Sequence, residues 1–518
     1  MPDFLAVAAL IGLAMLVWDC VEVGRNDAAN LVNAVFGARV LKRRVAITIA
    51  ATAVVLGATF SAPVMETARK GIFDPTVLTI QMALAIYVSV YFVDTVLLYA
   101  FSGFGMPVST TACLVFELVG AAMFLAGFDN VKWDKVLTVS LGIVFSIAIS
   151  GVGSFMVMRV FRAAIRDKSD DRKTMMTHGP WVSGAMLTWL VWFMVFKGLK
   201  NVTFVKRFKE EYFDLYGDWL VLLVMWSALT LIAHLLLLFF SKSGYKYLLP
   251  GTAILGMICM SFAFGQNDLA NAASPGLAGF TLWQSGGAPD DLAALATKIK
   301  IETWALFGCG MLMACGMFTK YAQRVTRAQI NTGSQFDQVN LYAPQWCKWL
   351  GRRYLELRSK AERALGFESD QNALAPAPGT SEKGKKIHYD SLRASVITGV
   401  SASVIAFASG RGLPVSTTYV AFAAVLGSGF ADQVFSRGDG DTKLGRAIWV
   451  VTCWFLAPII AIISAGTVAR IIYHLSTGGL VLCILLSFSI RYAFKRHADL
   501  HEQKHHFSAA GEDDETDQ

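Results

Sequence analysis

The sequence has few charged residues, and this shortage excludes an ordinary soluble domain. Asp, Glu, Lys and Arg make up 16% of its 518 residues, whereas soluble domains carry about 25%. The eight cysteines never form a Cys-x-x-Cys pair, so neither a metal site nor a disulfide framework is indicated. No basic segment precedes the first apolar stretch, and we therefore expect no cleavable signal peptide.

Long apolar stretches recur along the chain, and the mean hydropathy is +0.49. A helix needs about 20 apolar residues to cross the hydrocarbon core of a bilayer. Stretches near this length that contain no Asp, Glu, Lys or Arg are 45–65, 75–93, 95–116, 136–158, 394–410, 447–469 and 471–490. The sequence therefore predicts an all-α polytopic membrane protein with about 12 transmembrane helices.

The positive charge is concentrated in one polar segment. From Lys320 to Arg393 there are 13 Lys or Arg residues and 7 Asp or Glu residues, a net charge of +6. Basic loops of membrane proteins mark the cytoplasmic side, and we prefer this explanation to nucleic-acid binding. We expect a multi-pass protein of the cell inner membrane, in contact with lipid, with no nucleic-acid partner.

Two different motifs occur twice, in the same order. Gly24–Asn30 and Gly265–Asn271 both read G-x-N-D-x-A-N, and Gly105–Thr111 and Gly412–Thr418 both read G-x-P-V-S-T-T. Secondary transporters commonly contain internal repeats whose substrate site lies between the copies. The pattern predicts a membrane transporter built from two repeats.

The spacing of the motifs supports a duplication with one insertion. Asp27 precedes Ser109 by 82 residues and Asp268 precedes Ser416 by 148, a difference of 66 that matches the polar stretch 321–390. The predicted organisation is a first transmembrane repeat (1–175), connecting transmembrane helices (176–245), the first part of the second repeat (246–320), a polar cytoplasmic insert (321–390), the second part with a last helix (391–495), and a polar tail (496–518).

Both motifs favour interrupted helices. Gly, Asn and Asp weaken a helix, so we expect the first span to unwind near Asn26 and Asp27 and to resume to about Arg39. Pro107 and Ser109 suit the first turn of a helix, which predicts a half-helix that starts inside the membrane. Such re-entrant hairpins are tolerated only where they are buried in protein or line a cavity.

The motifs supply donors for an anion and oxygen ligands for a cation. Half-helix N-termini favour anions, and carboxylate and amide oxygens suit Na⁺ or a proton. A buried carboxylate can accept a hydrogen bond from protonated phosphate, which sulfate cannot offer, unless that carboxylate is itself protonated or covered by Na⁺. The candidate substrate-binding residues are Asn26, Asp27, Ser109, Thr110, Thr111, Asn267, Asp268, Ser416, Thr417 and Thr418.

Two further charged residues leave alternatives open. Arg25 lies beside the first motif, where it could contact the anion or replace a cation. Glu117 lies inside an apolar run without an evident partner, and it fits a proton-carrying group or a charge at the end of a span equally well.

At these residues the chain resembles the PiT family of inorganic phosphate transporters. The resemblance covers about 10–165 and 250–474, and Glu66–Gly71 is similar to a further stretch of that family's first repeat. It implies cation-coupled phosphate symport, an inverted-repeat fold and a homodimer. Asp27 and Asp268 would then take part in binding the coupling cation, Na⁺ or H⁺, with Asn30 and Asn271 as neighbours.

Other functions remain as alternatives. Some relatives carry sulfate, so a sulfate permease of the same fold is the first alternative, and a non-transporting phosphate receptor is the second. A third alternative, an intramembrane enzyme, would need a nucleophile with a base or a metal cluster, and neither is evident. We therefore expect no enzymatic activity and no cofactor besides the coupling cation.

Overall fold

The computed structural model is built from helices. It describes residues 4–62, 64–65, 72, 78–166, 168–200, 202–240, 243–284, 286–291, 302–364 and 386–505, without the side chains of 501–505. Its longer helices are α1 (Phe4–Gly37), α2 (Arg43–Ala58), α4 (Ile80–Gly103), α5 (Thr110–Ala126), α6 (Trp133–Ile165), α7 (Arg172–Val191), α10 (Asp218–Phe239), α11 (Tyr245–Gln284), α12 (Thr303–Met317), α13 (Lys320–Thr332), α14 (Gln345–Ala364), α15 (Ser391–Gly410), α16 (Thr417–Ala431) and α17 (Gly440–His505). Within these ranges we find no β-strand.

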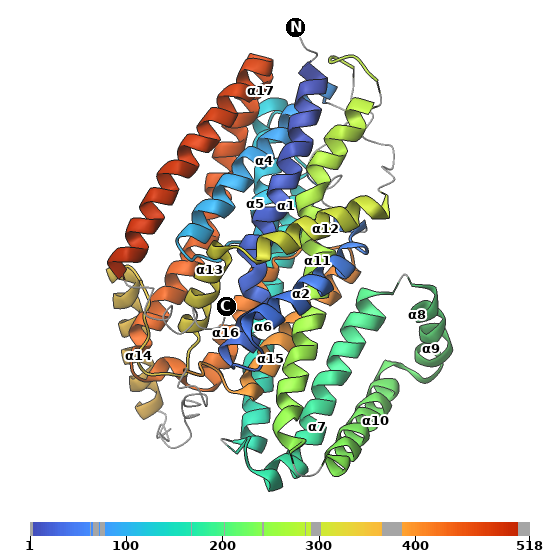
Figure 1. Ribbon diagram of the computed structural model, residues 1–518, viewed down its shortest axis with the longest axis vertical. Coiled ribbons are helices and arrows are strands. Elements are labelled where there is room, and N and C mark those ends of the chain that lie inside the picture. The colour runs from blue at the N-terminus through green and yellow to red at the C-terminus, as the bar shows by residue number, and fades with distance from the viewer. Residues whose placement is uncertain are drawn as a thin grey trace.

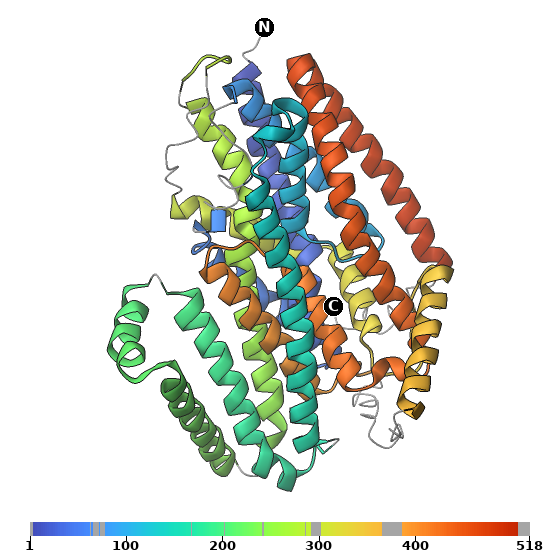
Figure 2. The ribbon, with the colours of Figure 1, turned by 180° about the vertical axis from the view of Figure 1, so that it is seen from behind.

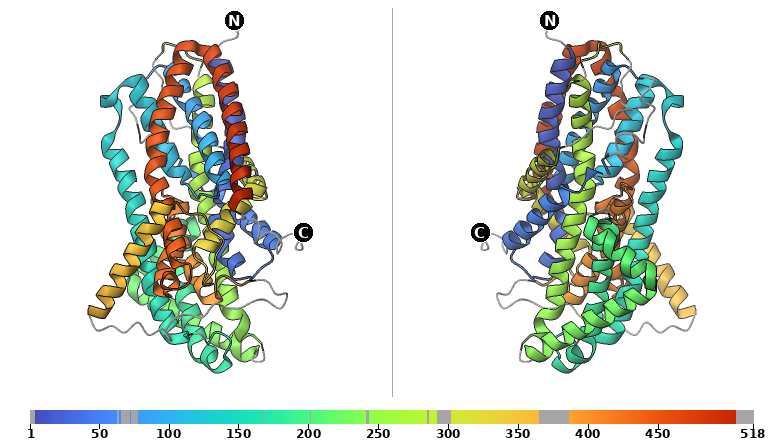
Figure 3. Two further views of the ribbon diagram at one scale, coloured as in Figure 1. Left: turned by 90° about the vertical axis from the view of Figure 1, so that its left-hand side faces the viewer. Right: turned by 90° about the vertical axis from the view of Figure 1, so that its right-hand side faces the viewer.

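The long helices stand side by side along the long axis of the molecule (Figure 1). In this view α1 runs downward from the N-terminus and α11 runs upward. Helices α4 and α5 lie in the upper half, whereas α15 and α16 lie in the lower half, and the view from behind agrees (Figure 2). Helix α17 turns back on itself at the top, where Ser476 has non-helical dihedral angles (Figure 3).

The composition of these helices fits a multi-pass membrane protein. Among the described residues, eight helices are long and apolar enough to cross a membrane. A ninth is added if α12 and α13, which meet at 68°, form one broken span. The number of about 12 crossings stays a prediction.

The predicted break in the first span is wrong. Helix α1 continues from Phe4 to Gly37 and α11 from Tyr245 to Gln284, each through its GxNDxAN motif. Asn and Asp weaken a helix by bonding their own backbone, but here the amide groups of Asn26 and Asn30 donate to partners outside α1. The side chains therefore do not compete with the helical hydrogen bonds.

Glycines in these helices serve close packing. A Cβ atom on Gly24 would overlap the backbone of Met313 in α12, and one on Gly265 would overlap that of Val54 in α2. A second contact lies three residues away on each helix. A Cβ atom on Gly316 of α12 would overlap the backbone of Val21 in α1, and one on Gly57 of α2 would overlap the backbone of Phe262 in α11. Helices α1 and α12 thus cross by the same reciprocal contacts as α11 and α2.

Two segments that the sequence marks only as polar contain helices. The predicted insert 321–390 includes nearly all of α13 and the whole of α14. The predicted tail from residue 496 is helical to His505, and Arg324 of α13 pairs with Asp499 at 2.8 Å. Residues 365–385 and 506–518 lie outside the described residues.

The reciprocal glycine contacts predict a specific loss of stability. Gly57→Ala and Gly316→Ala should each lower the free energy of unfolding by about 1–3 kcal/mol, because overpacking forces the helices apart. Thermal unfolding of the detergent-purified protein measures this. Gly308→Ala is the matched control in α12, because open space surrounds that position, and it should stabilise the helix by up to about 1 kcal/mol. Equal melting temperatures for Gly316→Ala and Gly308→Ala would contradict the prediction.

Candidate functional site

The two GxPVSTT motifs form equivalent hairpin tips. Gly105 follows α4 with φ +64° and Gly412 follows α15 with φ +70°, a conformation that glycine adopts without strain. The next residue closes each helix end, since the Met106 amide donates to the Phe101 carbonyl (2.9 Å) and the Leu413 amide donates to that of Ala408 (3.1 Å). The chain can therefore reverse its direction abruptly at each tip, in the middle of the molecule.

A new helix begins at each tip with its first amides pointing toward the centre. Ser109 caps α5 by accepting from the Ala112 amide (3.0 Å), and Ser416 caps α16 by accepting from the Tyr419 amide (3.1 Å). The first amides of a helix have no intrahelical partner and carry a partial positive charge. Two such N-termini in one site favour an anion.

Asp27 of α1 joins the two tips. Thr110 of the first tip donates to Asp27 Oδ2 (2.9 Å), and Thr418 of the second tip donates to Asp27 Oδ1 (2.5 Å). The amide groups of Asn26 and Asn30 donate to the same Oδ1 at 3.2 and 2.7 Å. Hydroxyl and amide donors from three segments thus surround this buried carboxyl group.

The second repeat makes some of the same contacts in reverse. Thr111 of the first tip lies 3.4 Å from Asp268 Oδ1 and 2.9 Å from the Val415 carbonyl, and it accepts from Asn271 (2.7 Å). Thr418 likewise accepts from Asn30 (3.0 Å). The last threonine of each tip therefore contacts the GxNDxAN motif of the other repeat.

The first asparagine of each motif fixes the tip of its own repeat. Asn26 donates to the Val108 carbonyl, and Asn267 donates to the Val415 carbonyl, both at 2.7 Å. Ser102 and Ser409 in turn lie 3.3 and 3.5 Å from the side-chain oxygens of these asparagines. These bonds tie each tip to α1 or α11.

The site is closed and contains unpaired oxygen acceptors. All ten candidate substrate-binding residues, with Asn30 and Asn271, are at most 1% exposed. Asp268 Oδ2 and Asn271 Oδ1 are buried without a hydrogen-bond partner among the described residues. Carboxylate and amide oxygens in this state match the ligands that a hard cation prefers, so these two residues fit the predicted coupling ion.

Sequence reasoning missed three polar residues of the site. Ser102 and Ser409 extend the repeated motif to S-G-x-G-x-P-V-S-T-T, and this longer match could have identified them. Gln329 of α13 donates to Asn30 Oδ1 (3.1 Å), although it lies in the segment assigned to a polar insert. No repeated pattern marks Gln329, because the insert has no counterpart in the first repeat.

Two further predictions from the sequence concern Arg25 and the stretch Glu66–Gly71. Arg25 pairs with Glu22 at 2.9 Å, and its guanidinium group lies 5.8 Å from the ring centres of Tyr99 and Tyr321. An anion contact by Arg25 stays a prediction. The stretch Glu66–Gly71 lies outside the described residues.

Comparisons with known proteins place this geometry in context. The sequence profile of the phosphate transporter family matches residues 23–331 and 381–465. A provisionally named phosphate permease of Thermococcus kodakarensis is 27% identical over 480 residues, with 90% of this chain and 97% of that protein covered. A protein of Chlamydia trachomatis with the same provisional name is 27% identical over 495 residues, with 91% and 98% covered.

One solved structure, described as the sodium-dependent phosphate transporter, has a similar fold. Its TM-score with this chain is 0.64 at 20% sequence identity, and the match covers 90% of this chain and 98% of that one. At this identity the likeness concerns the fold alone.

The shared threonine predicts a graded response to substitution. Thr418→Val should lower the free energy of unfolding by about 1–3 kcal/mol, because it removes a hydrogen bond to the buried Asp27 carboxyl group and one from the Asn30 amide. Thr418→Ser keeps the hydroxyl group and should lose less. Thermal unfolding in detergent compares them, and equal losses for the two variants would show that the hydroxyl group does not join the repeats.

Proposed function

Because the chain belongs to the phosphate transporter family, we propose that it is a secondary active symporter that takes up inorganic phosphate together with a cation. The observation that supports this most directly is the crossed arrangement of Asp27 and Asp268 with the two threonine tips. The names of the similar permeases and of the similar solved structure also support phosphate as the substrate.

Phosphate would be held between the two tips. The hydroxyl groups of Ser109, Thr110, Thr111, Ser416, Thr417 and Thr418, with the first amides of α5 and α16, are the donors that its oxygens need. Thr111 and Thr418 now bond across the repeats, so phosphate would replace those contacts when it enters. Asn26 and Asn267 would keep the tips in place during this exchange.

The carboxyl groups favour phosphate over sulfate. Phosphate near neutral pH keeps at least one O–H group, which Asp27 or Asp268 can accept as a hydrogen bond. Sulfate has no such group and would face a buried negative charge without a compensating bond. A sulfate permease is therefore the weaker alternative, and a non-transporting receptor has no specific observation in its favour.

The coupling cation would bind beside the phosphate. Asp27 with Asn30 and Asp268 with Asn271 provide paired carboxylate and amide oxygens in both repeats. These ligands suit Na⁺ and can also carry a proton. The geometry of the two pairs is compatible with either ion.

The two halves would form inverted repeats in an inner membrane. Helices α1 and α11 run in opposite directions (Figure 1), and each repeat packs against the other through equivalent glycines. The division at residues 1–175 and 246–495 with about 12 crossings would follow from this symmetry. The basic segment around α13 and α14 would face the cytoplasm, and the protein would act as a homodimer.

Transport by the purified protein tests the function. Labelled phosphate should enter proteoliposomes under a Na⁺ or a pH gradient, and an excess of sulfate should not compete. Asp27→Asn and Asp268→Asn should each slow uptake by about tenfold or more, because a lost charge-assisted hydrogen bond costs about 1.5–3 kcal/mol.

Asp134→Asn is the matched control, since Asp134 is exposed at the start of α6, and it should transport normally. Full competition by sulfate would favour the sulfate permease. Phosphate binding without uptake, in folded protein under both gradients, would favour the receptor.

A further inference from the structure

Three buried carboxyl groups outside the proposed phosphate site lie together in the first repeat. Asp19 of α1, Asp94 of α4 and Glu117 of α5 are each at most 2% exposed. Helix α4, which carries Asp94, packs against both α1 and α5, and the charges of Asp19 and Asp94 act on each other and on Glu117. We call these three residues the acidic triad.

The triad lacks hydrogen-bond donors. One oxygen of Asp19, one of Asp94 and both of Glu117 are buried without a partner among the described residues. An ionised carboxylate can only accept hydrogen bonds, so these groups cannot bond to one another unless one of them carries a proton. Because unpaired charge at membrane depth is costly, the triad cannot hold three negative charges.

The neighbouring ion pairs balance only one of these charges. Arg25 and Arg491 both pair with Glu22, each at 2.9 Å, which leaves one surplus positive charge. Arg491 also acts electrostatically on Asp19. The surplus charge can balance one ionised carboxylate of the triad, and the other two need a bound proton or another cation.

Protons fit the triad better than a metal ion does. In the part of the chain that the structure describes, no group of three or more His, Cys, Asp or Glu side chains could hold a metal ion. The other titratable groups with an electrostatic effect on the triad or near it are Cys20, Glu22, Asp27, Tyr91, Cys113, Cys309 and Arg491.

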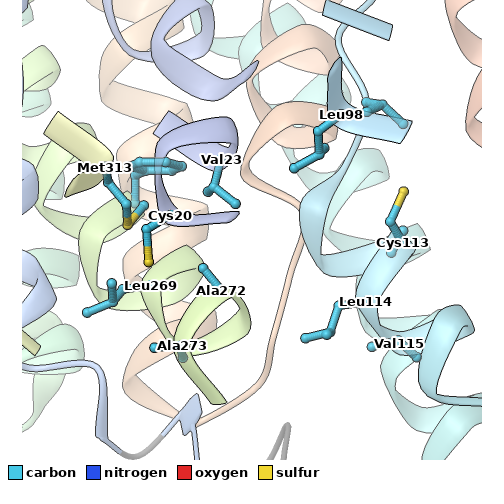
Figure 4. Close-up of a cluster of buried hydrophobic side chains, with 14 of the residues drawn as sticks. Cys20, Val23, Leu98, Cys113, Leu114, Val115, Leu269, Ala272, Ala273 and Met313 are labelled. Carbon is cyan, nitrogen blue, oxygen red and sulfur yellow. The ribbon is translucent and has the colours of Figure 1, made fainter. Parts of the chain in front are cut away.

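The triad stands in register with the phosphate site. On each of three helices, four-residue steps join a triad residue, an apolar residue and a site residue: Asp19–Val23–Asp27, Asp94–Leu98–Ser102 and Glu117–Cys113–Ser109. The middle residues belong to the buried apolar cluster (Figure 4). Eight helical residues span about 12 Å, so one apolar layer separates the triad from the site.

The second repeat has no such triad. The same steps of eight residues from Asp268, Ser409 and Ser416 lead to Met260, Ser401 and Ala424. The two repeats share the motifs that form the phosphate site. Eight residues away from these motifs, however, only the first repeat carries acidic residues. The acidic triad therefore distinguishes the first repeat from the second.

The triad lies on the side of the site toward the start of α1. The basic residues Lys42, Arg43 and Arg44 follow the other end of α1, and α14 lies in the lower part of Figure 1. Since basic loops mark the cytoplasmic side, the triad lies between the extracytoplasmic face and the phosphate site.

We propose that the acidic triad is a proton-binding site that loads from the extracytoplasmic side and couples proton entry to phosphate uptake, a role that rests on the phosphate symport proposed above. Glu117 accepts the exchangeable proton, while Asp19 and Asp94 share a second one. The proton on Glu117 removes a negative charge near the anion site, and it leaves again as H⁺ when the repeats open to the cytoplasm.

Electrostatics gives the size of this coupling. At an effective dielectric constant of about 20, one unit charge about 12 Å away changes anion affinity by about tenfold. Protonation of Glu117 should therefore tighten phosphate binding by about that factor. Glu117→Gln imitates the protonated form, so it should bind phosphate tightly without this pH dependence.

Infrared difference spectroscopy tests proton binding without any transport. The purified full-length protein is taken through a pH step in Na⁺-free buffer without phosphate. We expect C=O bands of protonated carboxyl groups that Glu117→Gln and Asp94→Asn each reduce. Ser401→Ala, at the position of the second repeat that matches Asp94, is the control and should leave them unchanged. If the bands persist in both acidic variants, the triad does not bind the proton.

Proteoliposomes with a trapped pH-sensitive dye test the coupling. In the native protein, phosphate accumulation should rise about tenfold per pH unit for each coupled proton, and the lumen should acidify with uptake. Glu117→Gln should lose the acidification and the response to a pH gradient, while phosphate–phosphate exchange persists. Melting curves show whether it is folded, and Glu117→Met, which also cannot carry a proton, replaces it if it is not.

The outcomes separate the two proposals. Uptake driven by a Na⁺ gradient alone, and unchanged in Glu117→Gln, would overturn the coupling role of the triad and leave phosphate symport intact. Absence of phosphate exchange in the native protein would overturn the symport and with it the coupling role, whereas proton binding would still be decided by the infrared bands.

Discussion

Burial of Asp27 at the centre of the molecule sets a requirement that much of the structure meets. A carboxyl group without water needs hydrogen-bond donors, and a missing donor costs about 1–3 kcal/mol. Threonines from both tips and asparagines from α1 provide them. Because one of these donors, Thr418, comes from the far end of the sequence, the carboxyl group is satisfied only when both repeats are assembled. The binding chemistry and the assembly of the fold therefore depend on the same bonds.

The repeats are interlocked, and this limits how the site can open. Helix α1 crosses α12 of the other repeat through reciprocal glycines, as α11 crosses α2. Backbones in such contact cannot slide far without separating. The hydroxyl contacts of Thr111 and Thr418 are by contrast single bonds that a ligand can replace. Opening by movement of the tips against the crossed helices is thus easier than unwinding of α1 or α11, which the continuous helical bonds oppose.

The sequence predicted the class of fold and the residues that meet at the centre, because both depend on local patterns. Apolar length marks membrane helices, and a duplicated motif marks equivalent positions without any knowledge of distances. Prediction from the sequence failed where tertiary contacts override the local conformational preference of a residue. Asn26 and Asp27 looked like helix breakers because their external partners lie 82 and more residues away. Gln329 could not be identified for a similar reason, since only the fold of α13 brings it to Asn30.

The two repeats are alike at the proposed phosphate site and differ at the acidic triad, and these two features have separate consequences. In the proposed transport cycle, a symmetric pair of tips and carboxyl groups would make the inward-open and outward-open forms similar in energy, as rapid alternation requires. Strict symmetry would also make the ligand contacts alike in both forms. The acidic residues Asp19, Asp94 and Glu117 break this equality, because Met260, Ser401 and Ala424 occupy the equivalent positions. In the proposed cycle, a proton that binds on one side and leaves on the other is what lets a pH gradient bias an otherwise balanced exchange.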